Sequence, residues 1–188
     1  MENNIRIFIA IKINPEQKLK AQFDEFKLLF KDERINWVQE DNFHLTLRFI
    51  GNTNAGQVRV LCDKLVELAK QINPFEFQIL GAGYFGTKDN PRVLFVNTRV
   101  PDEMKQLAND VEKAVVSLGF RGELKPFRPH LTLGRIKHLE NRSRFIRVLD
   151  EMPQQHYQSV HVSEFILYQG ILRPEGPVYQ PIKTFVLV

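Results

Sequence analysis

The chain has 188 residues, of which 43% are hydrophobic and 26% are charged, and its formal net charge is +4. This composition excludes a disordered or fibrous protein, and the single cysteine, Cys62, excludes a disulfide scaffold or a thiolate zinc site. The apolar run at residues 7–11 is too short for a signal peptide or a membrane span. We therefore expect a soluble, cytoplasmic protein without membrane partners.

The first predicted element is a strand over residues 5–12, where isoleucines at every second position alternate with other residues. A helix follows, with Asn14 as its cap and Pro15 at its first position. The apolar residues of that helix fall on one face: Leu19, Phe23, Phe26 and Phe30.

A second strand containing His44 comes next, followed by a helix over residues 55–71 and a strand over residues 75–80. The second half of the chain has the same order. It begins with a strand over 92–96 and a helix from Pro101 to Gly119, and continues with a strand at 130, a helix over 140–150 and a strand over 160–168.

This common order reflects an internal repeat at an offset of 86 residues. The strand at 6–10 is similar to that at 92–96, Pro15 matches Pro101, and the sequence His-Leu-Thr-Leu occurs at both 44–47 and 130–133. We interpret the chain as one domain, residues 1–188, made of two tandem copies at about 5–86 and 91–172. The remainder at the C-terminus has no counterpart.

Strands alternating with helices, but with hairpin-like neighbours, predict an α+β fold, or an α/β fold of two lobes. Tandem copies commonly pack with pseudo-twofold symmetry. We therefore expect antiparallel sheets that line a central cleft, with the helices outside.

The repeated His-Leu-Thr-Leu motif carries the chemistry. On a strand, His44 and Thr46 point to one face, and so do His130 and Thr132, while the leucines point to the core. Two copies around one cleft supply two imidazoles that titrate near neutral pH and two hydroxyl donors. No carboxylate or thiolate cluster accompanies them, so we expect no metal site and no cofactor.

Positive charge is concentrated around the second motif. Residues 119–147 hold eight basic side chains against two acidic ones. Such a field suggests an anionic partner, such as a phosphate or a nucleic-acid end, although a solvated basic face remains an alternative.

The segments around both motifs, residues 43–51 and 128–135, resemble those of the 2H phosphoesterase superfamily. Within it, the chain is most similar to RNA 2′,3′-cyclic phosphodiesterases, also called 2′-5′ RNA ligases. Residues 91–95, 167–169 and 176–179 share the resemblance, which extends from about residue 6 to residue 185.

The resemblance implies metal-independent hydrolysis of a 2′,3′-cyclic phosphate at an RNA end, or on a cyclic nucleotide, to a 2′-phosphomonoester. By analogy with the family, His44 is the proton donor and His130 the proton acceptor. Thr46 and Thr132 would donate hydrogen bonds to the non-bridging oxygens. Because the two copies are symmetric, the sequence itself does not distinguish the two histidine roles.

Four further residues are candidates for substrate binding. Arg135 matches a phosphate-contacting position of the family, but strict alternation puts it on the wrong face unless a bulge or strand end follows Gly134. Arg48 lies on the His44 face by alternation and could reach a phosphate. Phe8 and Tyr168 could stack on a base, and the alternative for both is a place in the core.

Two alternative functions stay open. One is the reversible 2′-5′ joining of RNA ends by the same residues. The other is a nucleotide-binding or RNA-end-binding module without turnover, which the two intact His-Thr pairs disfavour. We expect a monomer.

Overall fold

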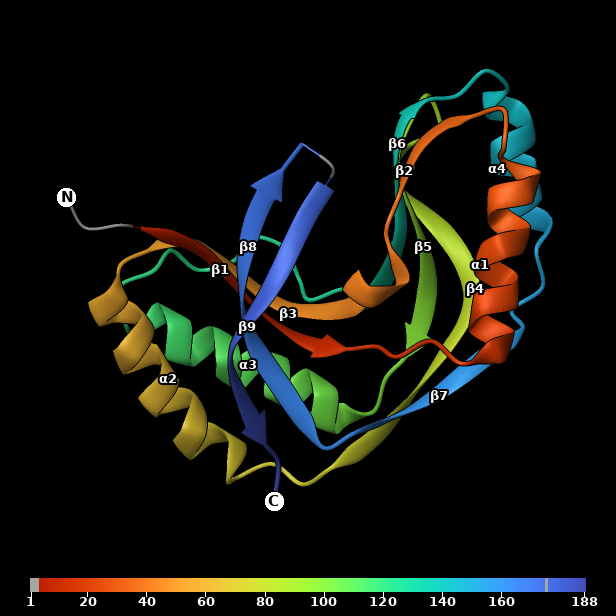
Figure 1. Cartoon of the computed structure of the whole chain (residues 1–188). Helices are drawn as coiled ribbons and strands as arrows, with labels where there is room; N and C mark the ends of the chain where they lie inside the picture. The colour runs from red at the N-terminus through yellow and green to blue at the C-terminus, as the bar shows by residue number, and fades with distance from the viewer. Residues whose placement is uncertain (1–3, 175) are drawn as a thin grey trace.

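The computed structural model describes residues 4–174 and 176–188, which form a mixed α+β fold (Figure 1). Within these residues nine strands form a single antiparallel sheet in the order β7-β4-β5-β6-β3-β1-β8-β9, and β2 pairs with β6 beside this path. The first half of the chain supplies β1 (Ile5–Lys12), α1 (Gln17–Leu29), β2 (Arg34–Trp37), η1 (Glu40–Asn42), β3 (His44–Thr53), α2 (Ala55–Ala69) and β4 (Phe75–Thr87). The second half supplies β5 (Asn90–Arg99), α3 (Asp102–Val116), β6 (His130–His138), α4 (Arg142–Glu151), β7 (His156–Val162), β8 (Glu164–Arg173) and β9 (Gly176–Val186).

The sheet divides into two lobes at its centre, where β3 and β6 meet through a single residue pair, Leu45 and Leu131. Lobe 1 contains β3, β1, β8 and β9, and α2 and α3 pack against it. Lobe 2 contains β6, β5, β4, β7 and β2, and α1 and α4 pack against it (Figure 1). The predicted fold, two lobes of antiparallel strands with helices outside, is confirmed.

The two repeats are interleaved between the lobes. The last strand of the first repeat, β4, pairs with β5 of the second, and β8 of the second repeat pairs with β1 of the first. Helix α3 of the second repeat packs on β3 of the first. Each lobe is therefore built from both halves of the sequence, so neither repeat is a lobe by itself.

The two faces of the sheet carry different apolar clusters. The main core contains the inward side chains of all four helices and the leucines of both motifs, including Leu45, Leu47, Leu131 and Leu133. A second, small cluster lies on the other face and contains Phe8, Ala10, Ile166 and Tyr168. We call that second face, which carries His44 and His130, the inner face.

The start of α1 differs from its prediction. The N-cap is Glu16 rather than Asn14, and no side chain of its own caps the helix. Instead the buried side chain of Gln158 on β7 accepts a hydrogen bond from the Glu16 N–H (2.9 Å) and donates one to the Asn14 carbonyl (2.9 Å). A residue 142 positions away thus satisfies the helix end, which local sequence could not reveal.

Three strand predictions are also corrected. The predicted strand at 160–168 is two strands, β7 and β8, which lie in different lobes with Ser163 between them. The strand at 75–80 extends to Thr87 and forms a hairpin with β5. Two strands were not predicted: the short β2, and β9, which occupies the C-terminal remainder.

Among the described residues, no helix is both long enough and apolar enough to cross a lipid bilayer.

Candidate active site

The two His-Leu-Thr-Leu motifs lie on the adjacent central strands β3 and β6. Their register is centred on Leu45 opposite Leu131. Because the strands are antiparallel, continuing this register by one residue in each direction places His44 opposite Thr132 and Thr46 opposite His130. All four side chains are half-buried, whereas the leucines are buried. The predicted gathering of two histidines and two threonines on one face thus follows from the strand pairing.

Each histidine is held by a backbone carbonyl two residues earlier. The Nδ1 of His44 lies 2.6 Å from the Asn42 oxygen, and the Nδ1 of His130 lies 2.7 Å from the Arg128 oxygen. A carbonyl can only accept a hydrogen bond, so Nδ1 must carry the proton in both rings. The neutral imidazoles therefore keep Nε2 as a free base, and the charged forms can donate from it.

Aromatic rings fix the orientation of both imidazoles. The His44 ring lies 5.2 Å from Phe8 and 5.1 Å from Tyr179, and the His130 ring lies 4.7 Å from Phe85 and 5.4 Å from Phe95. The distances join ring centroids, and three of the four pairs are edge-on, a favourable geometry for aromatic pairs.

Sequence reasoning did not identify Tyr179, Phe85 and Phe95. Phe85 comes from β4, and nothing in its local pattern links it to a histidine 45 residues away. A signal did exist for Phe95 and Tyr179, because they end the segments 91–95 and 176–179 that share the family resemblance. The structure places the Tyr179 ring against His44 through the β8–β9 hairpin.

The pKa values of both histidines are lowered from the ordinary 6.5. Burial is the main cause in each case, and the hydrogen bond to the backbone carbonyl opposes it. Positive charges lower both pKa values further: Lys12, His130 and Arg135 act on His44, and Arg128 and Arg135 act on His130. In the free protein both rings are thus biased toward the neutral form at neutral pH.

The charge of Arg135 lowers the pKa of His44, of His130 and of Tyr179. A β-bulge sets this residue on the inner face. The register along β5 jumps from Leu94 opposite Gly134 to Phe95 opposite Thr132, so Leu133 is the extra residue. The inner face after the bulge therefore carries Arg135, as the predicted phosphate contact requires, although the bulge lies one residue earlier than expected.

A matching bulge in β3 has the opposite consequence for Arg48. Ile9 pairs with Arg48 and Ala10 with Thr46, so Leu47 is the extra residue and Arg48 points to the helix-covered face. Its side chain is only 7% exposed. The guanidinium binds the carboxylates of Glu112 (2.6 Å) and Glu123, and it also donates to the carbonyl of Arg121. The structure contradicts a phosphate contact by Arg48, which anchors the α3–β6 loop instead.

The predicted base-stacking residues are covered. Phe8 is 3% exposed, with Tyr168 stacked on it at 5.2 Å and Phe49 and Tyr179 against its other sides. Tyr168 is 7% exposed. Neither ring offers a free face to a base: Phe8 packs against His44 and Tyr168 packs against Phe8, which corrects their predicted role.

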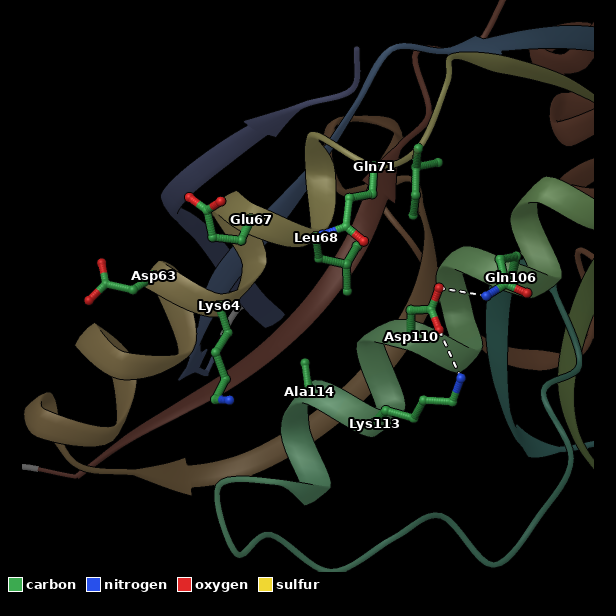
Figure 2. A pocket seen from close by; sticks show the side chains of 10 residues that line it. Asp63, Lys64, Glu67, Leu68, Gln71, Gln106, Asp110, Lys113 and Ala114 are labelled. Carbon is green, nitrogen blue, oxygen red and sulfur yellow. Dashed lines mark hydrogen bonds and ion pairs between the residues drawn. The ribbon is translucent and has the colours of Figure 1, made fainter.

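No group of three or more histidine, cysteine, aspartate or glutamate side chains within residues 4–174 and 176–188 could hold a metal ion. An open groove of about 720 Å³ does lie outside lobe 1, between α2 and α3 (Figure 2). Its walls carry charges of both signs, from residues such as Lys64, Glu67, Asp110 and Lys113, and none of the motif residues lines it. The inner face of β3 and β6 remains the candidate site.

Comparison with known protein families gives a match to the model described as LigT-like phosphoesterase. The model matches twice, over residues 11–95 and 94–179. Together the matches include both His-Leu-Thr-Leu motifs and both bulges, and they meet at β5, where the second repeat begins.

Similar proteins of known name cover nearly the whole chain. An RNA 2′,3′-cyclic phosphodiesterase of Thermotoga maritima is 32% identical over 177 residues, or 94% of this chain and 92% of that protein. One from Methanothermobacter thermautotrophicus is 29% identical over 183 residues, or 97% and 99%. Among solved structures, E. coli LigT complexed with 3′-AMP has a TM-score of 0.79 at 25% identity and 99% coverage of both chains.

Proposed function

Because the chain belongs to the LigT-like phosphoesterase family, we propose that the protein is an RNA 2′,3′-cyclic phosphodiesterase that forms 2′-phosphomonoesters. The observation that carries this proposal is the pairing of β3 with β6, which sets two histidines and two threonines around one point of the inner face. In both histidines Nδ1 is bound to a backbone carbonyl, which leaves Nε2 as the atom for proton transfer.

The reaction requires one proton to be removed and one to be supplied. In the proposed mechanism, Nε2 of neutral His130 takes a proton from water while the water oxygen forms a bond to phosphorus. The bond between phosphorus and the 3′ oxygen breaks, and Nε2 of protonated His44 gives its proton to that oxygen. The products are a free 3′-hydroxyl and a 2′-phosphate, and the two histidines have exchanged protonation states.

Negative charge builds on the non-bridging oxygens in the transition state. In the proposed mechanism the hydroxyls of Thr46 and Thr132 donate hydrogen bonds to these oxygens, one from each lobe. Arg135 supplies the compensating positive charge, since the bulge sets it on the same face as the two motifs and a guanidinium can bind phosphate oxygens through several N–H groups. These groups belong to the protein, so the proposed mechanism uses no metal ion and no cofactor.

The phosphate also explains how His44 can be protonated in the complex. In the free protein, burial and three positive charges lower its pKa. A bound anionic phosphate opposes these effects and raises the pKa, so substrate binding itself favours the acid form. The assignment of donor and acceptor follows the family resemblance, and it is tested separately below.

We also propose that RNA ends are the natural substrates and that the enzyme acts as a monomer in the cytoplasm. One chain supplies both motifs and Arg135, so the proposed chemistry needs no second copy. The lone cysteine fits a reducing compartment.

The test is hydrolysis of a short RNA ending in a 2′,3′-cyclic phosphate by the wild type, His44→Ala and His130→Ala. We expect each variant to lose at least about a hundredfold in kcat, the usual contribution of a positioned acid or base. Circular dichroism and thermal unfolding show whether each variant is folded. Near-normal turnover by folded His130→Ala would contradict the mechanism, and binding without turnover by the wild type would indicate a binding module.

A further inference from the structure

Asn42, two residues before His44, connects two parts of the candidate site. Its backbone carbonyl accepts the hydrogen bond from Nδ1 of His44 (2.6 Å), and its side-chain amide donates one to the carbonyl of Pro177 (3.0 Å). Pro177 lies near the start of β9, 135 residues further along the chain. The turn η1, which ends at Asn42, is therefore tied both to the imidazole and to the β8–β9 hairpin.

The end of the β8–β9 hairpin extends past the strand beside it. Within the described residues the ladder between β1 and β8 ends at Gln169, before β8 itself ends (Figure 1). The partner of Tyr179 on β8 lies just past the end of that ladder, and the Tyr179 ring packs edge-on against His44 at 5.1 Å. The hydrogen bond from Asn42 to Pro177 ties this part of the hairpin, and with it the ring, to η1.

The second repeat has the same arrangement around His130. Arg128 lies 86 residues after Asn42, and its carbonyl accepts the hydrogen bond from Nδ1 of His130 (2.7 Å). Its guanidinium lies over the ring of Phe85 on the β4–β5 hairpin, 5.4 Å from the centroid, and that ring is edge-on to His130. A cation–π contact here replaces the amide hydrogen bond. In both lobes the residue two before the histidine binds Nδ1 with its carbonyl, and its side chain contacts the hairpin whose ring packs on the same imidazole.

We propose that Asn42 is a positioning residue for His44, because its side-chain amide ties the hairpin that carries Tyr179 to the turn that binds Nδ1. This inference rests on the proposed function, in which Nε2 of His44 must reach the leaving 3′ oxygen. With Nδ1 bound on one side and an aromatic ring packed against the imidazole, Nε2 keeps one direction. A proton donor held in one direction raises the rate of the chemical step without binding the substrate more tightly.

The first experiment measures hydrolysis of a short RNA ending in a 2′,3′-cyclic phosphate by the wild type and Asn42→Leu. Leucine has the branched shape of asparagine but no amide donor, and the backbone carbonyl stays. We expect kcat to fall about tenfold or more with KM within about twofold, since the imidazole is displaced while the phosphate-binding groups stay in place. Gln106→Ala, which removes an exposed amide hydrogen bond to Asp110 (2.6 Å) on α3, is the matched control and should keep both values. An unchanged kcat for folded Asn42→Leu would overturn the proposal.

A double-mutant cycle separates positioning from a direct contact between Asn42 and the substrate. If Asn42 acts through the Tyr179 ring, Asn42→Leu should cost little once that ring is absent. The kcat of the double variant with Tyr179→Ala should therefore lie within about twofold of that of Tyr179→Ala alone. Losses that multiply in the double variant would contradict this route. Circular dichroism and thermal unfolding check that each variant is folded.

NMR tests the positioning without turnover. In the wild type, nuclear Overhauser signals should join the ring protons of His44 and Tyr179, and those of His130 and Phe85, whose centroids lie 5.1 and 4.7 Å apart. Asn42→Leu should weaken the first set of signals and leave the second unchanged. Signals of equal strength in both proteins would overturn the proposal. If the wild type hydrolyses no cyclic phosphate, the proposed function fails, and this comparison still decides whether Asn42 positions His44.

Discussion

Among the described residues, Arg135 is the one whose charge lowers the pKa of both His44 and His130, the proposed catalytic pair. Its guanidinium lowers the pKa of His44 and of His130, so removing that charge must raise both values. In the proposed mechanism the rate depends on one histidine being neutral and the other protonated. The pH profile of kcat/KM is therefore expected to be bell-shaped, with its maximum below the ordinary histidine pKa of 6.5 in the wild type.

Arg135→Gln should raise the pKa of both histidines and move the kcat/KM maximum to higher pH. NMR titration of the histidine ring carbons measures the two pKa values in the free protein. Arg142→Gln is a suitable comparison, because Arg142 is bound to the backbone oxygen of Asp89 (2.8 Å) and does not shift either catalytic histidine. Unchanged titration of both rings in Arg135→Gln would show that Arg135 lies too far away to contact the phosphate.

The donor role of His44 can be separated from the acceptor role of His130 by changing the leaving group. A cyclic substrate with sulfur in place of the 3′ oxygen releases a thiolate, which needs no proton to leave. We expect this substrate to restore much of the activity of His44→Ala and little of the activity of His130→Ala. Restoration in His130→Ala alone would reverse the assignment.

At the scale of residues, local alternation along a strand was enough to predict which face the four motif side chains lie on. His44, Thr46, His130 and Thr132 precede the bulges, so a period of two places them correctly relative to the leucines. Beyond the bulges the same rule fails. Arg48 lies on the helix-covered face and Phe49 on the inner face, the reverse of what alternation predicts. The sequence contains no clear mark of the extra residue at Leu47, while the glycine at 134 gives a hint of the one at Leu133.

At the scale of elements, the two central strands differ in what lies beside them beyond the point where they meet. On β6 the partner is β2, where Trp37 pairs with Gly134. The equivalent of Gly134 on β3 is Arg48, and there the α3–β6 loop is held by a guanidinium instead of a strand. The repeat therefore predicts the central strands well, but it does not show that one copy replaces strand pairing with an ion-pair anchor.

Arg48→Met should lower the free energy of unfolding by about 1–3 kcal/mol, because Glu112 and the Arg121 carbonyl lose a charged hydrogen-bond partner. Urea denaturation measures the change. Lys70→Met, which removes the exposed ion pair with Glu67 (2.7 Å), should change stability by less than about 1 kcal/mol. KM for the cyclic phosphate should rise little in Arg48→Met. A large rise in KM with unchanged stability would restore the phosphate contact that the structure contradicts.

Gly134→Ala should also destabilise the protein, for a steric reason. A Cβ at this position would lie 2.6 Å from Cγ2 of Ile35, so β2 must shift away from β6. Such overpacking typically costs about 1–3 kcal/mol. Gly56→Ala in α2, where the nearest atom would lie at 3.4 Å, should instead be neutral or slightly stabilising. Equal stability of Gly134→Ala and the wild type would show that β2 does not pack closely on β6.

At the scale of the whole molecule, duplication explains why one domain has two histidines facing one point. The two central strands meet at Leu45 and Leu131, and each repeat gives its last strand to the other lobe. The offset of 86 residues predicts the duplication. It does not predict that the repeats exchange their last strands, since alternation and periodicity describe one strand at a time. The C-terminal strand β9, which has no counterpart in the sequence repeat, brings Tyr179 to His44.

The same duplication has been altered so that the lobes carry different chemistry. Lobe 1 has the exposed ring of Phe49 beside Phe8, whereas in lobe 2 the charges of Arg135 and Arg128 act on His130. A cyclic phosphate on a nucleoside has one anionic and one aromatic part. The asymmetric pair of lobes therefore suits a nucleotide better than a symmetric phosphate alone.

The central claim is that these protein groups alone open the cyclic phosphate and release the 3′ oxygen. It is tested most directly by ³¹P NMR of an RNA oligonucleotide ending in a 2′,3′-cyclic phosphate, incubated with the wild-type protein in excess EDTA. We expect the cyclic phosphate signal to be replaced by that of a 2′-phosphomonoester, at a rate that EDTA does not change. A persistent cyclic phosphate, or a 3′-phosphomonoester as the product, would contradict it.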